Sequence, residues 1–411
     1  MAHTVLHVIP AVAPRYGGPS VATFGMCRAL AGYDVDCVVA TTDADGPERL
    51  PVETGSIVRY GDVPVIFFPR TFSESLKWSG PLASWVHSHV SGFDLVHIHA
   101  VFSHASITAG RACRRAGVPY LVRPLGNLDP WSLARHGWRK QVLLRLGARE
   151  LLRRADAIHY TSDAERALAE RALPGLPRGV VVPLGVEDDL FAGTSPVPPN
   201  EPPYLLALCR LDVKKGIDLL IEAFHALHAG GSAADWSLTI AGDGDPAYVA
   251  RLHRLADTGA ARDRITFRGW VTGPERHALI AGAGAFALPS HQENFGLSVV
   301  EAMACAVPVI ITPGVNVSSE VAQHHAGWVV PRERGAWAQA LARVLADRTE
   351  LARRGRLARG LAEQFRWPSV GRQLVDAYGA LLRPRAADAS PARQASPRPR
   401  FAPPAGARMD H

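Results

Sequence analysis

The chain has 411 residues, of which 47% are apolar and 20% are charged. This length exceeds a single hydrophobic core of ordinary size, and the composition is that of globular proteins, so we expect two domains. The five scattered cysteines lack a CxxC spacing, which argues against a disulfide framework or a zinc site and favours a reducing cytosol. No apolar run approaches the roughly 18 residues of a membrane-spanning helix, and no basic segment precedes the first run, so we expect neither a membrane span nor a signal peptide.

The net charge of +7 is unevenly distributed along the chain. Residues 383–411 hold six arginines and two aspartates, so this segment carries +4 of the +7. The segment is rich in proline, alanine and serine and has little to bury, so we expect a disordered basic tail. The remainder is near neutral and carries no motif of a nucleic-acid-binding module, so nucleic acid is not an expected partner. We expect the protein in the cytoplasm.

Short apolar runs alternate with helical patterns along the whole chain, which indicates a parallel α/β architecture. In the first half we expect strands at 5–9, 35–40, 65–68, 94–99, 120–122, 157–160 and 180–183. In the second half we expect strands at 204–209, 238–241, 265–267, 285–288, 309–311 and 328–330, with helices at 217–227 and 247–257. From 336 to 382 the pattern is helical only, with a break at Pro368.

A proline-rich stretch at 193–203 separates the two halves and is the predicted linker, because prolines block continuation of sheet or helix. The sequence therefore predicts two Rossmann-like domains, at 1–192 and 204–368, followed by a crossover helix at 369–382. Open parallel sheets of this kind bind ligands at the carboxyl ends of their strands.

The most informative segment in the second half runs from Ser290 to Ala304. Glu293 precedes the expected start of a helix, and Glu301 follows eight residues later. A continuous helical rise would separate the two carboxylates by roughly 12 Å along the axis. This suits an elongated ligand with hydroxyl groups at each end and a diphosphate facing the free helix amides, as in a nucleotide sugar. A capping glutamate followed by a solvated helical glutamate is an equally good interpretation of this segment alone.

A second segment supports the nucleotide-sugar interpretation. Arg210 and Lys215 follow the first strand of the second half, where both side chains would project from the carboxyl end of the sheet. A diphosphate needs cations there, and arginine offers a bidentate fork while lysine offers a point charge. A solvated basic loop is a common explanation of such a segment alone, but less so when the segment is paired with the first one.

The two segments together resemble glycosyltransferase family 4, the glycosyl transferases group 1. The resemblance rests on Arg-Leu-x-x-x-Lys-Gly at 210–216 and Glu-x7-Glu at 293–301, with further matches at 241–244, 267–271 and 365–368. It covers roughly residues 1 to 382, while Cys209 and Ala306 stand where the family often has glycine. It implies an α/β GT-B fold of two Rossmann-like domains facing each other across a cleft, with the C-terminal helix returning to the N-terminal domain. It also implies a retaining reaction, a UDP-, GDP- or ADP-sugar donor, and neither a cofactor nor a bound metal.

The resemblance assigns the expected site residues. In the reaction, the imidazole of His99 would contact the sugar near its anomeric carbon, and the cations would stabilise the leaving diphosphate. The expected catalytic set is His99, Glu293, Arg210 and Lys215. The expected donor-binding set is Gly17, Gly18, Gly244, Val271, Asn294, Phe295, Gly296, Leu297 and Glu301. The expected acceptor-side set is Arg123, Asn127 and Asp129.

Three details of the first half remain open. Gly17 and Gly18 follow the first strand, where the glycines allow a backbone to approach a ligand closely but also suit an ordinary turn. We interpret His97 as a core histidine satisfied by backbone, and His104 as a weaker candidate for the reacting centre. Residues 131–155 read as a basic amphipathic helix that would lie on an anionic membrane surface or pack its apolar face on the first sheet.

We therefore expect a hexosyltransferase that moves a hexose from a nucleotide sugar to a saccharide or lipid-linked acceptor. The expected setting is polysaccharide, lipopolysaccharide or glycolipid biosynthesis, in the cytoplasm or attached peripherally to the inner face of a membrane. The alternatives are a nucleotide-sugar epimerase or hydrolase on the same fold, and a non-catalytic saccharide-binding protein. The base, the sugar, the acceptor and the linkage stay open.

Overall fold

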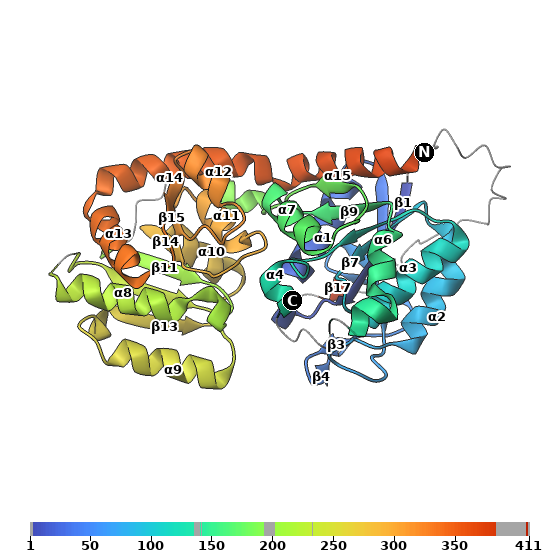
Figure 1. Cartoon of the computed structure of the whole chain (residues 1–411), viewed down its shortest axis with the longest axis horizontal. Coiled ribbons are helices and arrows are strands. Elements are labelled where there is room, and N and C mark those ends of the chain that lie inside the picture. The colour runs from blue at the N-terminus through green and yellow to red at the C-terminus, as the bar shows by residue number, and fades with distance from the viewer. Residues whose placement is uncertain are drawn as a thin grey trace. The chain divides into compact units, whose positions relative to one another are not determined.

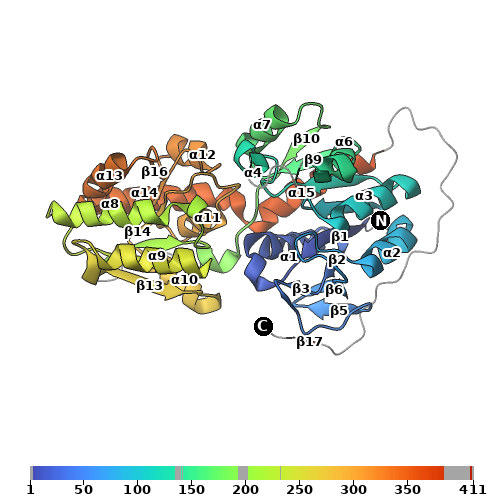
Figure 2. The same cartoon turned by 60° about the horizontal axis from the view of Figure 1, so that its bottom comes forward.

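The structure is a computed structural model that describes residues 3–134, 140, 142–192, 202–231, 233–383 and 408–409. The chain forms two compact units, one from residues 1–185 together with 367–411, and one from 186–366 (Figures 1 and 2). The chain passes from the first unit to the second after Gly185, whereas the sequence placed the linker at 193–203. Residues 193–201 of that linker, and most of the tail expected at 383–411, lie outside the described residues.

The first unit is built on a sheet with the strand order β10-β9-β8-β7-β1-β2-β6-β5-β17. Its strands are β1 (His3–Ala11), β2 (Val35–Thr42), β5 (Ile57–Tyr60), β6 (Val63–Phe68), β7 (Leu95–His99), β8 (Tyr120–Arg123), β9 (Ala157–Tyr160), β10 (Gly179–Val181) and β17 (Arg408–Met409). Neighbouring strands are parallel except β5 and β6, and a short separate hairpin joins β3 (Ala44–Asp45) to β4 (Glu48–Arg49). Its longer helices are α1 (Gly18–Ala31), α2 (Gly80–His89), α3 (His104–Ala116), α7 (Asp163–Ala172) and α15 (Trp367–Leu382). The expected strands are confirmed, because buried parallel strands read as continuous apolar runs.

The second unit is a wholly parallel sheet with the order β13-β12-β11-β14-β15-β16. Its strands are β11 (Tyr204–Leu208), β12 (Ser237–Ala241), β13 (Ile265–Gly269), β14 (Ala285–Leu288), β15 (Val309–Ile311) and β16 (Gly327–Val329). Its helices are α8 (Ile217–Ala229), α9 (Pro246–Asp257), α10 (Gly273–Ala281), α11 (Leu297–Ala304), α12 (Ser318–Gln323), α13 (Arg334–Ala346) and α14 (Arg348–Ala362). In both units the strand order reverses beside the first strand, so both sheets are Rossmann-like and each has a topological switch point.

The last helix, α15, belongs to the first unit. The indole of Trp367 fills a space left by two glycines, since a Cβ atom at Gly25 or Gly185 would lie only 2.0 or 2.3 Å from the ring. The hydroxyl of Tyr33 also donates to the Pro368 carbonyl at 2.8 Å. The break expected at Pro368 is found two residues earlier at Arg366, whose backbone is extended, and the proline itself lies in the first turn of α15, where its missing N–H costs nothing.

The helix expected over 131–155 is helical in its described residues as far as Arg153, but it is not one regular α-helix. The structure has α4 (Pro130–Ala134), then a π-helical turn at Leu144–Ala148, then α6 (Arg149–Arg153), while residues 135–139 and 141 lie outside the described residues. The break comes at Gly147, whose φ of 148° is not helical. Leu151 and Leu152 are buried in the core of the first unit, as internal packing would require, but Val142 and Leu146 are exposed.

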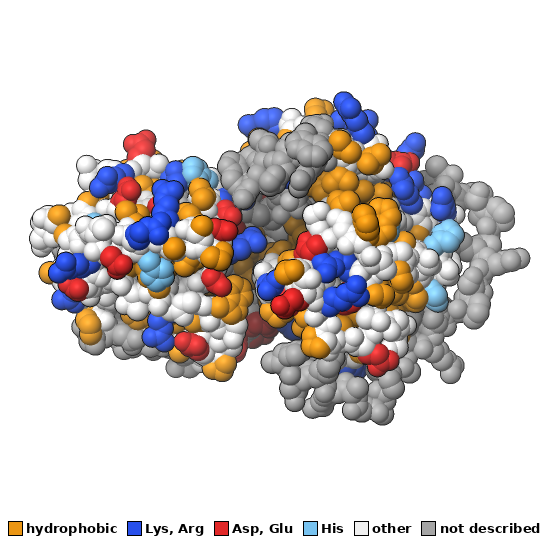
Figure 3. Space-filling view, turned by 90° about the horizontal axis from the view of Figure 1, so that it is seen from below, with side chains coloured by type: hydrophobic (Ala, Val, Ile, Leu, Met, Phe, Trp, Pro, Cys, Tyr) orange, Lys and Arg blue, Asp and Glu red, His pale blue; other side chains and the backbone are white. Residues whose placement is uncertain are grey.

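Large apolar side chains are exposed on both units. Among the described residues, those on the first unit are Val21, Phe72, Trp78, Val142 and Leu146, and those on the second are Val213, Trp270 and Leu357. Figure 3 shows one face of the molecule, on which hydrophobic side chains form a patch over the first unit with basic side chains along its border. Patches of this kind mark surfaces that bind a ligand, a partner or a membrane.

Candidate functional site

The switch point of the second sheet lies between β11 and β14, and the loops that follow these two strands are in contact. Gly216 adopts a left-handed conformation with a φ of 67° at the start of α8. A Cβ atom at this position would lie 2.4 Å from the Pro289 carbonyl oxygen, so only glycine lets the two loops approach this closely. The His291 amide donates to the Lys214 carbonyl at 2.8 Å and ties the loops together.

This contact brings Lys215 and Glu293 into an ion pair between Nζ and Oε2, both side chains being largely buried. Neighbouring backbone fixes Glu293, because its amide donates to the Gly314 carbonyl at 2.8 Å and its carbonyl accepts from the Asn316 amide at 3.2 Å. Two residues that lie 78 positions apart in the sequence, and that the sequence assigned to one site, therefore meet.

Arg210 lies exposed at the end of β11, beside Cys209. Burial raises the pKa of the Cys209 thiol to about 12, while the neighbouring charges of Lys215, Glu293 and Arg210 shift it in both directions. These three charges and that of Asp212 all act on one thiol, so they lie near the end of this strand.

Glu301 has a partner that the sequence did not indicate. Arg276 of α10 grips its carboxylate with both terminal nitrogens, the Nη1–Oε1 distance being 2.7 Å. Burial lowers the pKa of Arg276, but the Glu301 carboxylate outweighs it and the net shift is upward, so the guanidinium stays charged. No motif surrounds Arg276 in the sequence. The only feature that could have indicated it is its place in the helix that follows residues 267–271, one of the segments that resemble the family.

The continuous helix assumed between Glu293 and Glu301 does not occur. The helix α11 begins at Leu297, and Gly296 before it has a φ of 84°, so the chain turns between the two carboxylates. The estimate of about 12 Å along one helix axis therefore does not apply. The glutamates are instead held by two different cations, Lys215 and Arg276.

The remaining predicted donor residues have mixed environments. Gly244 packs against the loop after β11, since a Cβ atom there would lie 1.9 Å from the Leu211 carbonyl oxygen. Phe295 is buried edge-on against Phe365, so it offers a ligand only its backbone. Val271 is buried as well. Asn294 is half-buried, and its carbonyl accepts from the Asn316 side chain at 2.9 Å.

Several buried polar atoms beside this site have no hydrogen-bond partner in the described part of the chain. Among the described residues, the Ser290 hydroxyl, both side-chain amide atoms of Gln292 and the Nε of Arg332 are buried without a hydrogen-bond partner. Gln292 is only 8% exposed. Buried polar groups are nearly always paired, so unpaired groups beside the Lys215–Glu293 pair point to a bound polar ligand.

The loop after β1 in the first unit is open. Gly17 has a φ of 68° and begins α1, and no described atom lies within 4 Å of where a Cβ atom would stand at Gly17 or Gly18. These glycines are therefore not required by packing inside the protein, and a ligand can approach their backbone closely.

His99 lies in a cluster of fully buried histidines at the first switch point. Its Nε2 and the Nδ1 of His7 share a hydrogen bond of 3.0 Å, while its Nδ1 has no partner within the described part of the chain. Burial lowers the pKa of both rings, that of His7 to about 3, with the Arg123 charge adding to the effect. His99 is therefore a neutral imidazole.

The neighbouring hydrogen bonds fix the tautomers of two further histidines. His159 donates from Nε2 to the Val182 carbonyl at 2.8 Å, so its Nδ1 must accept from the Nε2 of His97 at 3.2 Å. The Nδ1 of His97 in turn accepts from the Tyr378 hydroxyl at 2.8 Å. His97 is a core histidine as expected, but side chains rather than backbone satisfy it, and its hydrogen bond to Tyr378 attaches α15 to the sheet.

The predicted acceptor-side residues have internal partners. Arg123 is fully buried and donates to the Pro19 carbonyl at 3.3 Å. The amide of Asn127 donates to the Pro124 carbonyl at 3.0 Å, and buried Asp129 accepts from the Ser132 amide at 2.8 Å. In this conformation Arg123 ties the end of β8 to α1, and Asp129 stabilises the start of α4.

An aromatic cluster near the same edge of the sheet was missed. The indole of Trp78 stacks on the imidazole of His104 with ring centroids 3.7 Å apart, yet remains 41% exposed. Beside it, Tyr16 donates to Glu74 at 2.9 Å, and Lys77 lies over the Tyr16 ring. The sequence feature that could have indicated this cluster is a tryptophan in a polar loop without strand or helix periodicity.

Comparison with known proteins places these features in a family. The family model for the glycosyl transferase 4-like domain matches residues 17–185, and that for glycosyl transferases group 1 matches residues 194–360. The chain is 33% identical over 399 residues to D-inositol 3-phosphate glycosyltransferase of Salinispora tropica, covering 88% of this chain and 81% of the relative.

Two solved structures share the fold. Sucrose-phosphate synthase from Thermosynechococcus elongatus superposes with a TM-score of 0.75 at 22% identity, over 92% of this chain and 99% of that one. HepE of Anabaena in complex with UDP and glucose superposes with a TM-score of 0.72 at 20% identity, over 92% and 100%. The chain therefore belongs to glycosyltransferase family 4, the glycosyl transferases group 1, and is a glycosyltransferase of the GT-B type.

Proposed function

We propose that this glycosyltransferase moves a hexose from a nucleoside diphosphate sugar to a saccharide or lipid-linked acceptor, with retention of configuration and without a metal. The observation that carries the proposal is the cluster at the switch point of the second sheet. There Arg210, Lys215 and Glu293 gather beside the buried, unpaired amide of Gln292. Cations, a carboxylate and unpaired polar atoms together suit a ligand that carries both phosphates and hydroxyls.

In the proposed complex, the diphosphate lies against Arg210 and Lys215 and the free amides at the start of α11. These groups are already fixed, Lys215 by its ion pair and the amides by the turn at Gly296. Fixed positive charge stabilises the negative charge that develops on the departing diphosphate, and such preorganisation is usually the largest single contribution to catalysis. Two cations in these positions can do this without a metal ion.

Glu293 and Glu301 would accept hydrogen bonds from the two hydroxyl-bearing ends of the donor. A carboxylate has about four lone-pair sites, so Glu301 can hold Arg276 and still accept from ribose hydroxyls. Glu293 would likewise keep Lys215 and accept from the sugar. The sugar would be oriented by Glu293, and the diphosphate by its Lys215 partner.

The first unit would supply the reacting centre and the acceptor. The neutral imidazole of His99 would contact the sugar near its anomeric carbon, and the open loop at Gly17 and Gly18 would let the donor phosphates approach the backbone. The exposed face of Trp78, fixed by stacking on His104, offers an apolar surface to an acceptor sugar ring.

The comparisons suggest which compounds to try first. HepE was solved with UDP and glucose, which supports a UDP-sugar as the first donor. The curated relatives are named for D-inositol 3-phosphate, which supports a small phosphorylated polyol as one acceptor beside saccharides and lipid-linked saccharides. No described helix combines the length and hydropathy needed to cross a membrane. We infer a cytoplasmic enzyme that attaches peripherally to the inner face of a membrane and acts in polysaccharide, lipopolysaccharide or glycolipid biosynthesis.

The test is a product analysis. The chain is incubated with a UDP-, GDP- or ADP-hexose and an acceptor, with a metal chelator present, and the anomeric proton of the product is followed by NMR. We expect the configuration of the donor to be kept, and we expect Lys215→Ala to lose activity while the neighbouring Lys214→Ala keeps it. An inverted product would refute retention. Epimerised donor, or free hexose formed without acceptor, would favour the epimerase or hydrolase alternative.

A further inference from the structure

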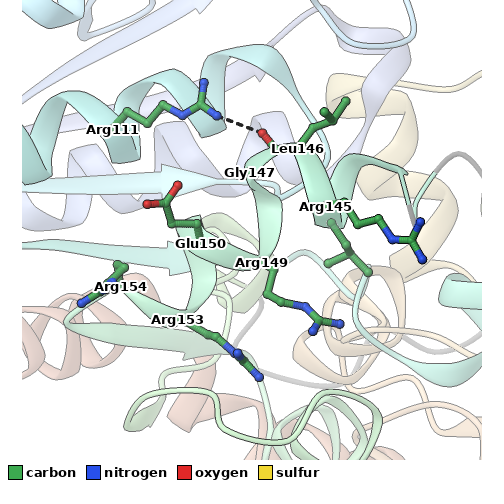
Figure 4. Close-up of a pocket in the computed structure, with 9 residues that line it drawn as sticks. Arg111, Arg145, Leu146, Gly147, Arg149, Glu150, Arg153 and Arg154 are labelled. Atoms are coloured by element: carbon green, nitrogen blue, oxygen red, sulfur yellow. Dashed lines mark hydrogen bonds between the residues drawn. The ribbon is translucent and has the colours of Figure 1, made fainter.

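An arginine-lined concavity lies on the first unit, away from the histidine cluster. It has a volume of about 590 Å³, and its lining includes Arg111, Arg145, Arg149, Arg153 and Arg154. Figure 4 shows these side chains arranged around the concavity, with Arg111 reaching in from α3 and the others coming from the π-helical turn and α6.

The π-helical turn shapes this concavity. A Cβ atom at Gly147 would lie 2.8 Å from Ile107 and 3.0 Å from the Arg111 guanidinium, so the glycine is required here. The turn also leaves the Leu146 carbonyl free to accept from Arg111 at 2.9 Å (Figure 4). The same turn leaves the Leu146 side chain 63% exposed among the arginines. Single π-helical turns are costly and occur often at functional sites.

The concavity is strongly positive. Glu150 is the one carboxylate of its lining, and that carboxylate is already paired with Arg114 at 2.9 Å. Within the described part of the chain, none of the five lining guanidiniums has a carboxylate at ion-pair distance. Five uncompensated guanidiniums around one depression attract a polyvalent anion, and arginine matches phosphate oxygens with a bidentate fork.

A second concavity of about 310 Å³ adjoins the basic one. The two share Leu144, Arg149 and Arg153, and the rest of the second is lined by apolar residues, Leu152, Ala172, Leu173, Pro174 and Leu176. A phosphate-bearing headgroup fits the first concavity and hydrocarbon fits the second, so the pair suits an amphiphile. Sites for single-stranded nucleic acid typically add aromatic side chains on which bases stack, and neither described lining contains one.

We propose that this arginine surface docks on a membrane rich in anionic phospholipids, with phosphate headgroups bound by the arginines and Leu146 and Val142 entering the interface. Basic side chains with exposed aliphatic neighbours are the composition that binds such a surface. The inference rests on the proposed function in one respect, because a lipid-linked acceptor would require the acceptor-binding unit to meet a membrane.

The test measures partitioning of the full chain onto vesicles of phosphatidylcholine alone or mixed with equal amounts of phosphatidylglycerol. We expect binding only to the anionic vesicles. The double substitution Arg149→Ala with Arg153→Ala should weaken it about thirtyfold, which converts to about 2 kcal/mol at about 1 kcal/mol per arginine. Leu146→Ser should weaken it as well, by removing the inserted side chain.

Matched controls keep the result specific. Arg343→Ala with Arg356→Ala removes the same charge from exposed positions on α13 and α14, and Leu357→Ser removes an exposed leucine from α14. Both should bind vesicles like the unaltered chain. Equal loss in the controls, equal binding to neutral vesicles, or a preference for single-stranded RNA would overturn the proposal. Stabilisation by nucleoside diphosphates, measured on the same variants, should not change and reports on the proposed function separately.

Discussion

The buried histidines make the first unit sensitive to mild acid. His7, His97, His99 and His159 are fully buried, and burial lowers the pKa of each below its ordinary value of 6.5, to about 3 for His7 and His159. These rings stay neutral in the folded chain but take up protons once it unfolds. Their contribution to stability is therefore complete above about pH 6.5 and is lost as the pH falls from there towards about 3.

The magnitude follows from the number of rings. Each buried neutral histidine lowers the free energy of unfolding by about 1.4 kcal/mol per pH unit below the pKa of the unfolded chain. Four such histidines lower it by about 5 kcal/mol between about pH 7.5 and about pH 5.5. Hydrogen exchange of the β7 and β9 amides, followed by mass spectrometry at both pH values, measures this in the first unit alone.

A single substitution tests the origin of the effect. His159→Gln keeps a donor for the Val182 carbonyl but cannot titrate. The loss of unfolding free energy between the two pH values should therefore shrink to about 4 kcal/mol. Exposed His324→Gln is the matched control and should leave the loss unchanged. A free energy of opening that stays level over this range would refute the reasoning, because it would mean that the buried rings are charged or solvated in the folded chain.

Three further predictions follow from individual contacts. Arg276→Met should cost about 3 to 5 kcal/mol of unfolding free energy by stranding the Glu301 carboxylate, and adding Glu301→Gln should restore most of it; a denaturant melt in which the second change restores nothing would contradict the pairing. Trp78→Ala should raise the acceptor KM about fivefold, from a stacking contribution of about 1 kcal/mol, without altering donor binding in the same kinetic assay. Gly25→Ala should lower the melting temperature and expose the α15 amides to exchange, because its methyl would overlap the Trp367 ring, whereas Gly80→Ala, which has open space, should do neither.

The strands of both sheets could be predicted from the sequence because their burial on two sides leaves largely apolar runs, as in β11 and β14. The strand β5 was missed, since it is antiparallel to β6 and only partly buried. The passage between the units after Gly185 was missed because the proline-rich stretch further on is a stronger linker signal than the single Pro183 and the acidic residues 187–189.

The site could be predicted in part. The pairing of Lys215 with Glu293 follows from loops that parallel topology must bring to one edge of the sheet. The turn at Gly296 agrees with the sequence, in which Glu293 and a glycine precede the helix start, and only the helical rise applied from Glu293 to Glu301 was wrong. Arg276 and the Trp78–His104 stack depend on tertiary contacts that leave no spacing in the sequence.

The central claim is that the switch point of the second sheet binds a nucleoside diphosphate sugar. The most direct measurement is thermal stabilisation by UDP, GDP and ADP and their hexoses, on the unaltered chain and on Arg210→Ala. A ligand at about 100 times its dissociation constant adds about 2.7 kcal/mol, which a melting curve resolves. We predict that one nucleotide series stabilises the unaltered chain and that Arg210→Ala loses most of this effect. No stabilisation by any of them, with or without magnesium, would contradict the account.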